Sequence, residues 1–306
     1  MLRCRTILSA LALTLFTVTG NAQYAWDIGV QGGFANYLGE IGGGDGEARD
    51  WIADMKLDQT RWNSGVFIRY RADYNFALNF TVNYARLQGA DSLVGNPNRF
   101  TRNLHFRNDI FEAVLLGEYY FFNQPDVGRT GRYLLDLKAY FFAGAGVFYN
   151  NPKARLGNTW YALQPLNTEN LESPYSKIQP TFPVGIGMFY TFSRLHRFGW
   201  KFGWRYTLTD YIDDVSTVYP SKTVFTDQIA AQLYNRSHEV ADNPLASELA
   251  QYFTVGGIRG NPDALDSYLL TSFSYSYVIR GKSRSFGRRK NYLYGRRRGR
   301  MGKAKF

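Results

Sequence analysis

Cysteine and histidine are both scarce in this 306-residue sequence, which contains one cysteine, Cys4, and three histidines. A single cysteine forms no intramolecular disulfide, so a fold without disulfides or thiol chemistry is expected. The sequence also contains no GxSxG, HExxH or P-loop pattern. It therefore gives no sign of an α/β-hydrolase, a zinc protease or a P-loop nucleotide-binding protein.

Long apolar runs are missing as well. Beyond the first 22 residues no stretch of 18 or more apolar residues occurs, which excludes a helical membrane protein. Arg3 and Arg5 precede an apolar segment at 7–18 and a small-residue site at 20–22. This order is typical of a secretory signal peptide, which is predicted over 1–22; a short buried helix is the alternative. Cys4 lies far from the cleavage site, so the chain is not expected to be a lipoprotein.

What the sequence does contain is alternation. In residues 198–208 aromatic and apolar residues occupy every second position, and glycine, lysine, arginine and threonine occupy the positions between them. A period of two predicts a β-strand with one apolar and one polar face. In a soluble sandwich the apolar face would point inward. In an outer-membrane barrel it would face lipid, and 9–11 residues would span the bilayer.

Seven more segments show similar alternation, and the predicted strands are 25–34, 64–74, 77–88, 109–122, 133–149, 180–192, 198–208 and 265–280. Long connections near 36–62, 89–107, 150–179 and 212–264 alternate with short ones near 75, 127 and 195. Short helices are predicted at 227–235 and 244–253. Outer-membrane barrels sort their loops in this way, with short periplasmic turns and long external loops. The sequence therefore predicts an all-β, eight-stranded antiparallel transmembrane barrel over residues 23–280, in the outer membrane.

The interior of an eight-stranded barrel is just wide enough for its own side chains. Inward positions of the predicted strands carry charges of both signs. They are Arg69, Arg71, Lys138, Lys201, Arg205, Glu112, Glu118 and Asp136. A salt-bridge network that fills the lumen is the favoured interpretation. A selective pore is the alternative, and it is poorly supported at this strand number.

Catalytic and metal sites have weak candidates. A lipid-modifying enzyme would need a nucleophile, a base and an acid near the barrel rim. However, His105 and His238 are expected in external loops and His196 in a periplasmic turn. Asp210, Asp213 and Asp214 lie where the strand that begins at Phe198 meets the last loop. Calcium binding is one interpretation, and a hydrogen-bonded loop anchor is the favoured one. No cofactor and no catalytic residue is predicted.

The C-terminal segment 281–306 holds 11 lysines and arginines and no acidic residue, whereas the rest of the chain sums to zero net charge. The candidate partner-binding residues of this tail are Arg288, Arg289, Lys290, Arg296, Arg297, Arg298 and Arg300. Aromatic residues between basic clusters would suggest nucleic acid in a cytosolic protein. Behind a signal peptide and a barrel we expect no nucleic acid. The tail is predicted to be disordered and periplasmic, either as a docking element or as a solubilising end.

Several separate stretches also resemble one family. DIGVQGGFANYLGEIG, RNLHFRNDIFEAVLLGEYYFF, YALQPLNTE, YSKIQPTFPVGIGMFY and GWRYTLTDYIDDVSTVY occur in the same order as in PorG-like outer-membrane proteins of Bacteroidetes, which are associated with the type IX secretion system. The resemblance spans most of 25–220.

This resemblance implies a non-enzymatic barrel in contact with outer-membrane lipid. It also implies that the barrel anchors the periplasmic ring of the secretion machine, whose subunits are a lipoprotein and its partner. No small-molecule substrate is expected. A stand-alone barrel that binds surfaces through its external loops is the alternative, and a lipid-modifying enzyme is less favoured.

Overall fold

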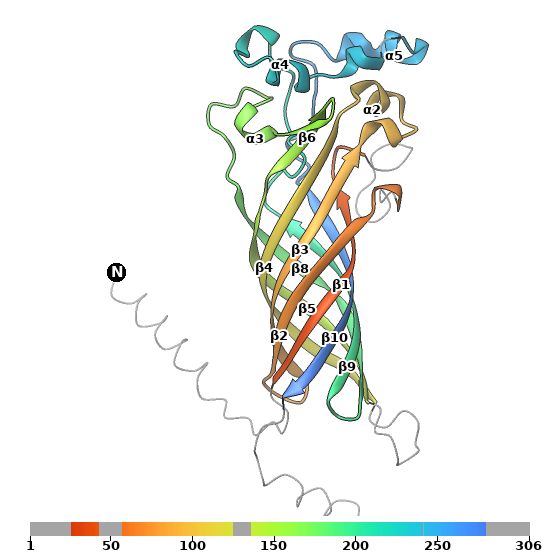
Figure 1. The fold of residues 1–306 in the computed structure, drawn as a ribbon, viewed down its shortest axis with the longest axis vertical. Coiled ribbons are helices and arrows are strands. Elements are labelled where there is room, and N and C mark those ends of the chain that lie inside the picture. Colours follow the sequence, from red (N-terminus) through yellow and green to blue (C-terminus); the bar gives the residue numbers. More distant parts are fainter. Residues whose placement is uncertain (1–25, 43–56, 125–135, 241, 280–306) are drawn as a thin grey trace, which may run out of the picture.

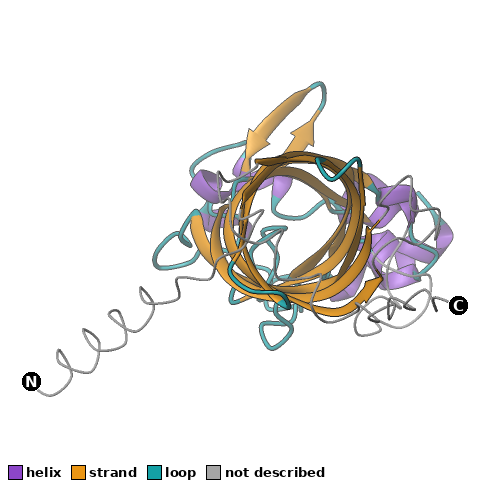
Figure 2. Cartoon of the chain, turned by 90° about the horizontal axis from the view of Figure 1, so that it is seen from below, coloured by secondary structure: helices purple, strands orange, loops and turns teal. Residues whose placement is uncertain are grey.

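The computed structural model of the protein describes residues 26–42, 57–124, 136–240 and 242–279. The predicted fold class is confirmed, because eight antiparallel strands close into a barrel (Figures 1 and 2). The barrel strands are β1 (Trp26–Leu38), β2 (Arg61–Arg71), β3 (Phe76–Ala90), β4 (His105–Gln124), β5 (Asp136–Tyr149), β8 (Ile178–Phe192), β9 (His196–Thr207) and β10 (Ser267–Ile279). The predicted signal peptide and basic tail lie outside the described residues.

Strand pairing follows the chain around the ring. Each strand pairs with its predecessor and its successor, and β1 pairs with β10 to close the barrel. Closure removes the unpaired sheet edges that would otherwise expose backbone donors and acceptors. Successive side chains alternate between the two faces, so the period of two in the sequence becomes an outer row and an inner row.

The outer row is apolar and exposed. On β1, Trp26, Ile28 and Val30 are 47%, 50% and 57% exposed. The other strands continue this surface with exposed large side chains, among them Val66, Phe80, Leu115, Phe141, Ile186, Phe198 and Phe273. A contiguous apolar surface of this extent is not stable against water. A closed barrel with an apolar outer band is the architecture of outer-membrane proteins, and this band is the surface that meets lipid.

The connections are sorted by length, as predicted. Residues 72–75 and 193–195 form short turns at one end of the barrel, called the turn end below. The turn expected near 127 lies outside the described residues. The long connections gather at the opposite end (Figure 1). Their described parts, 39–42, 57–60, 91–104, 150–177, 208–240 and 242–266, are called the loop crown.

The loop crown contains short elements of its own. Its helices are α2 (Pro97–Arg102), α3 (Leu163–Leu166), α4 (Ala230–Leu233) and α5 (Pro244–Leu249). Its single turns of 3₁₀-helix span Leu57–Gln59, Asp91–Leu93, Lys222–Val224, Ser237–Val240 and Ala250–Tyr252. The helices predicted in the last loop are therefore present, although both are shorter than expected. None of the helices in the described part of the chain has the length and apolarity needed to span a membrane.

Two local features differ from the expectations. A hairpin of β6 (Pro152–Leu156) and β7 (Thr159–Ala162) stands in the third long loop, where no strand was predicted. Strand β4 begins at His105, so this histidine is in a strand and not in a loop. The early start of β4 has a physical cause, because β3 extends to Ala90 and pairs with β4 as far as His105.

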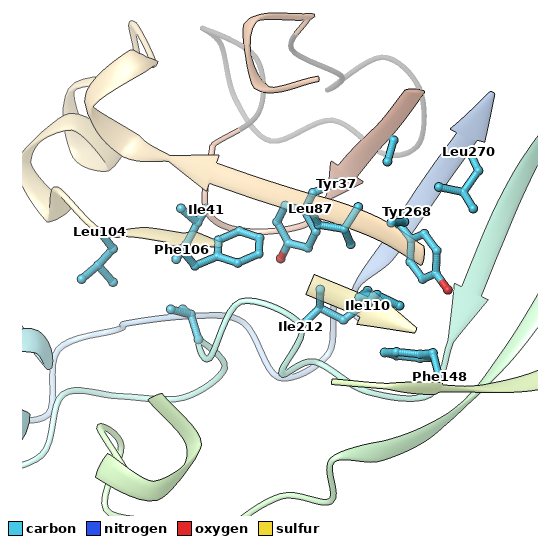
Figure 3. Packing of buried hydrophobic residues seen from close by; sticks show 13 residues of the cluster. Tyr37, Ile41, Leu87, Leu104, Phe106, Ile110, Phe148, Ile212, Tyr268 and Leu270 are labelled. Carbon is cyan, nitrogen blue, oxygen red and sulfur yellow. The ribbon is translucent and has the colours of Figure 1, made fainter. Parts of the chain in front are cut away.

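A hydrophobic cluster closes the barrel where it meets the loop crown. Ile212 and Val215 from the last loop pack with side chains of β1, β3, β4, β5 and β10 (Figure 3). The cluster includes Tyr37, Ile41, Leu87, Leu104, Phe106, Ile110, Phe148, Tyr268 and Leu270, all of them buried. The last loop therefore contributes to the packing of the barrel itself and does not simply lie over its opening.

A second cluster fills the barrel nearer the turn end. It contains Val114, Leu116, Tyr120, Tyr140, Phe142 and Phe189, with Ala77. Glycines on facing strands make room for these rings. A Cβ placed on Gly187 would lie 2.5 Å from the ring of Tyr140, and one on Gly203 would lie 2.6 Å from the ring of Phe142. The sequence places glycine where an aromatic ring crosses the narrow lumen.

Candidate functional site

The buried charges of the lumen centre on Arg69 of β2. Its Nε donates to Glu118 at 2.7 Å, and its Nη1 donates to Asp27 at 3.0 Å. Glu118 also accepts from the amide of Asn79 at 2.6 Å and the hydroxyl of Tyr120 at 2.9 Å. These groups come from β1, β2, β3 and β4, so one network joins four strands across the lumen. Buried charges need this degree of pairing to be tolerated.

Two members of this network were not among the predicted charge set. Asp27 is fully buried, and its carboxylate forms ion pairs with Arg69 and with Arg197, at 2.6 Å from the latter. The sequence interpretation placed Arg197 in a turn, whereas it is the second residue of β9 and points into the lumen. The sequence did contain a signal for this position. His196 and Phe198, on either side of Arg197, are aromatic residues of the outer row, so alternation places Arg197 on the inner row.

A second network lies nearer the loop crown. Glu112 of β4 accepts hydrogen bonds from the hydroxyl of Tyr268 at 2.7 Å and the amide of Asn83 at 2.9 Å. The Nε of Arg205 lies 3.5 Å from the same carboxylate. These contacts tie β9 and β10 to β3 and β4. Together the two networks and the two hydrophobic clusters fill the lumen along its length.

The remaining predicted charges behave differently. Arg71, Lys138 and Lys201 point into the barrel, but within the described ranges none of them forms an ion pair. Lys201 faces the ring of Phe67 at 5.1 Å, and Lys138 lies 5.3 Å from the ring of Tyr120. Asp136 is half-buried and also has no ion pair among these residues. The lumen thus carries more cations than its carboxylates neutralise.

The aspartates that follow β9 connect the loops of the crown. Asp213 accepts from the backbone amides of Ile41 at 3.1 Å and Val215 at 2.9 Å. Asp214 accepts from the hydroxyls of Thr168 at 2.5 Å and Tyr175 at 2.7 Å. These bonds join the first, third and fourth long loops. The geometry is that of the loop anchor favoured above.

Two buried arginines also connect the loops of the crown. Arg102 of α2 pairs with Asp91 at 2.8 Å and donates to the carbonyl oxygens of Glu40 at 2.7 Å and Arg259 at 2.9 Å. Arg259 in turn pairs with Glu169 at 2.7 Å. Glu169 also accepts from the backbone amide of Ser216 at 2.9 Å. All four long loops are therefore connected through buried polar groups.

Carboxylates outnumber cations in this buried part of the crown, and burial raises the pKa values of two of them above the usual range. Burial raises the pKa of Asp210 to about 9, and Asp213 and Glu40 nearby add to the effect. Burial likewise raises the pKa of Asp214 to about 7, although Arg259 and two hydroxyl donors oppose the rise. Desolvation favours the neutral acid wherever a positive partner does not compensate for it.

No metal site is formed by these acids. Within the described ranges, no group of three or more histidine, cysteine, aspartate and glutamate side chains is placed to hold a metal ion. Asp210, Asp213 and Asp214 are close in sequence, but Asp213 and Asp214 use their oxygens on different loops, and the oxygens of Asp210 accept no hydrogen bond within the described ranges. Calcium needs six to eight oxygens converging on one point, which this arrangement does not provide.

The three histidines are separated, and His196 lies at the opposite end of the barrel from the other two, as expected, although it is the first residue of β9 and not part of the turn. Its ring lies at the turn end, 2.7 Å from the hydroxyl of Tyr275. His105 at the crown end accepts a backbone hydrogen bond from Arg155 and contacts Arg236 at 2.8 Å. His238 is exposed on the last loop. His105 therefore links β4 to the β6–β7 hairpin and the last loop.

A cleft of about 960 Å³ opens on one side of the crown. It lies between the end of β1, helix α2 and the stretch from Leu249 to Leu265, and Glu40, Arg99, Phe253 and Ile258 contribute to its walls. Tyr252, Val255 and Ile258 beside it are 61%, 67% and 75% exposed. Cavities of this size with apolar walls and a few charged groups are typical of ligand sites. The sequence analysis did not identify this cleft.

The seven basic tail residues named above, from Arg288 to Arg300, lie outside the described residues. The comparisons with known proteins concern the rest of the chain. A family model described as "Domain of unknown function (DUF6089)" matches residues 5–233. The chain belongs to this family. The matched range includes the strands from β1 to β9 and the crown aspartates Asp91, Asp210, Asp213 and Asp214, but not Asp266 or β10.

Among curated protein sequences no match is found. Similar solved structures include the N-terminal β-barrel domain of OprF from Pseudomonas aeruginosa, with 10% identity, a TM-score of 0.35, and coverage of 84% of this chain and 98% of that one. The attachment invasion locus protein Ail of Yersinia pestis, solved with a heparin analogue, has 8% identity, a TM-score of 0.33, and coverage of 83% and 99%.

The outer membrane protein AlkL has 12% identity, a TM-score of 0.26, and coverage of 87% and 94%. With similarity this low, the fold described above rests on the strand pairing of the chain itself.

Proposed function

We propose that this protein is a non-enzymatic anchoring component of the type IX secretion apparatus in the outer membrane. The observation that carries the proposal is the filled lumen. Ion pairs centred on Arg69 and Glu112 and two hydrophobic clusters occupy the barrel from the turn end to the crown. A barrel filled in this way offers no passage for a substrate. Its apolar outer row keeps the barrel in the lipid bilayer.

The secretion role is supported by where the resembling stretches lie in the fold. The stretch that begins at Arg102 supplies Arg102 itself together with Glu112 and Glu118, and the stretch that begins at Gly203 supplies Arg205 and the aspartates at 210, 213 and 214. The resemblance to PorG-like proteins therefore involves residues that fill the barrel and join its loops. A family likeness in such residues favours a shared scaffold role. The partners proposed on this basis are outer-membrane lipid and the periplasmic ring proteins, a lipoprotein and its partner.

The absence of an enzymatic role is also part of the proposal. In the described ranges the histidines have structural partners or stand apart from acids and hydroxyls that could form a triad. Ser237 precedes His238, but its hydroxyl donates to Asn235 at 2.8 Å. A nucleophile needs a base within hydrogen-bonding distance. Replacing His105 or His238 is therefore expected to leave membrane lipid composition unchanged.

The proposed docking element is the basic tail, 281–306. The test is a mild-detergent pull-down of the full-length protein from its own outer membrane, beside a form truncated after residue 280. A matched third form keeps the length but replaces the seven named tail arginines and lysine with glutamine. Ring proteins should co-purify with the full-length form alone. If all three forms retain them equally, the tail is not the docking element; if none retains them, the anchoring role itself is wrong.

A second candidate function is favoured by the crown cleft. Its exposed apolar residues and the ion pairs that hold the loops in place suit a barrel that binds another surface from outside. In that case Ile258→Asp would abolish surface binding, while Val224→Asp, an exposed apolar residue elsewhere in the crown, would not. Unchanged adhesion of cells carrying Ile258→Asp would contradict this second candidate.

A further inference from the structure

At the turn end of the barrel, Arg71 of β2 and Lys138 of β5 both lie beside the aromatic ring of Tyr120 on β4. Arg71 is the last residue of β2 and Lys138 is the third residue of β5. The guanidinium of Arg71 lies 5.9 Å, and the ammonium of Lys138 5.3 Å, from the ring centre of Tyr120. The ring of Tyr74 lies 5.4 Å from the same ammonium. Two cations therefore lie beside one aromatic ring near the end of the barrel.

These two cations lack the carboxylates that pair the other lumen arginines. Asp27 is already shared by Arg69 and Arg197, and Glu118 is bound by Arg69. Asp136 lies two residues before Lys138 on the same inner row, but among the described residues it pairs with neither cation. The Nε of Arg71 is buried and has no hydrogen-bond partner in the same part of the chain. Lys138 is 4% exposed.

We propose that this turn-end pair, Arg71 and Lys138 with the rings of Tyr74 and Tyr120, binds one compact oxyanion, a carboxylate or a phosphate group. Like charges held close together in a poorly solvated space repel each other, and an anion between them removes that repulsion. A guanidinium and an ammonium are the donors that form strong charge-assisted hydrogen bonds to such groups. Arg197, whose guanidinium is already paired with Asp27, adds positive potential nearby.

The size of the ligand follows from the barrel. An eight-stranded lumen admits side-chain-sized groups and no polymer. The rings of Tyr140 and Phe142, which follow Lys138 along β5 toward the crown, are buried in the lumen on the crown side of the pair. The bound group therefore enters from the turn side and stops at the pair. Acetate is the probe for a carboxylate group that belongs to a protein or to a cell-wall stem peptide. Inorganic phosphate is the probe for a phosphate group. This inference does not depend on the secretion role.

The experiment is calorimetric titration of the full-length protein in zwitterionic detergent with acetate and with inorganic phosphate, at constant ionic strength set by chloride. Saturable binding of at least one anion is expected, and the anion that binds identifies the ligand class. Lys138→Met should weaken this binding about tenfold or more, because one charge-assisted contact is lost.

Lys201→Met is the matched control, since it removes another buried lumen lysine without an ion pair, away from the turn end. It should change the affinity less than twofold. Arg71→Met provides an independent second variant if Lys138→Met fails to fold. The proposal is overturned if the unmodified protein binds neither anion saturably, or if Lys201→Met weakens binding as much as the turn-end variants do.

Discussion

The lumen of the barrel and the loop crown both bury many charges, but they do so with opposite sign. The lumen holds an excess of cations, Arg69, Arg71, Lys138, Arg197, Lys201 and Arg205, over the buried carboxylates Asp27, Glu112 and Glu118. The crown buries the carboxylates Asp91, Glu169, Asp210, Asp213, Asp214 and Asp266 around the two arginines Arg102 and Arg259.

The two regions therefore obtain their stability in different ways. In the lumen, permanent cations pair with carboxylates of other strands, and the excess positive charge rests on aromatic rings. In the crown, the excess is acidic, so part of it is relieved by protonation. The crown should therefore respond to pH as well as to mutation.

The largest effect is expected from Arg69→Met, which tests the lumen side of this comparison. The change leaves the carboxylates of Asp27 and Glu118 buried with fewer partners. Breaking a buried pair in this way costs about 3–5 kcal/mol. Denaturant unfolding of the refolded barrel in detergent measures the loss. Arg86→Gln, which breaks a partly exposed pair with Asp109, should cost less than about 1 kcal/mol; equal losses would refute the ranking.

Arg259→Gln tests the crown side and should act locally. The side chain of Arg259 is 2% exposed and pairs with Glu169, so about 3 kcal/mol of local stability should be lost. Limited proteolysis should then cut within 208–266 much faster, while hydrogen exchange of the barrel strands stays unchanged. Arg236→Gln removes a more exposed pair with Glu239 and serves as the control. Loss of barrel protection would show that the crown and barrel are one cooperative unit.

Gly187→Ala tests whether the lumen is as closely packed as described. A Cβ there would meet the ring of Tyr140 at 2.5 Å, and overpacking of this kind costs about 1–3 kcal/mol. Gly32→Ala on β1 is the matched control, because its nearest neighbour would be the carbonyl oxygen of Asn63 at 3.6 Å. Equal unfolding free energies for the two variants would mean that the lumen can accommodate an additional methyl group at residue 187.

A further effect concerns pH and the crown. Because burial raises the pKa of Asp210 to about 9 from an ordinary value of 3.8, its ionisation costs the folded crown more than the unfolded loop. Its contribution to crown stability is complete below pH 3.8 and is lost as the pH rises toward 9. Proteolysis of 208–266, corrected for protease activity, should therefore be faster at pH 9 than at pH 5.

Asp210→Asn sharpens this test, because the amide imitates the neutral acid at every pH. The variant should resist cleavage better than the unmodified protein at pH 9 and only slightly better at pH 5. Asp227→Asn, on the exposed surface of the same loop, should change neither rate. A cleavage rate that does not depend on pH would contradict the claim that ionisation of buried carboxylates destabilises the crown.

Much of the barrel was predictable because the alternation of apolar and polar residues can be recognised within each strand by itself. Alternation along Phe198, Trp200 and Phe202 defines an outer row within one strand, and the same row appears in the structure. The placement of long and short connections at opposite ends of the barrel followed from the order of the strands alone. The inward direction of Arg69 and Glu118 followed from the same period of two.

The partners of these residues were not predictable, since they come from strands far apart in sequence. Arg69 meets Glu118 across 49 positions, and Arg259 meets Glu169 across 90. Arg197 was missed because a strand start beside a short turn looks like part of the turn. The β6–β7 hairpin was missed because its strands of five and four residues are too short to show a clear period. The crown cleft has no sequence signature, because its walls come from three separate segments.

Electrical recording measures whether the lumen of the barrel is filled. The purified full-length protein would be reconstituted into a planar lipid bilayer, and single-channel current would be measured at neutral pH in simple salt. The account predicts no steady conductance after verified insertion, because ion pairs and two hydrophobic clusters occupy the lumen. A stable, reproducible open-channel current would contradict it and would make this barrel a pore.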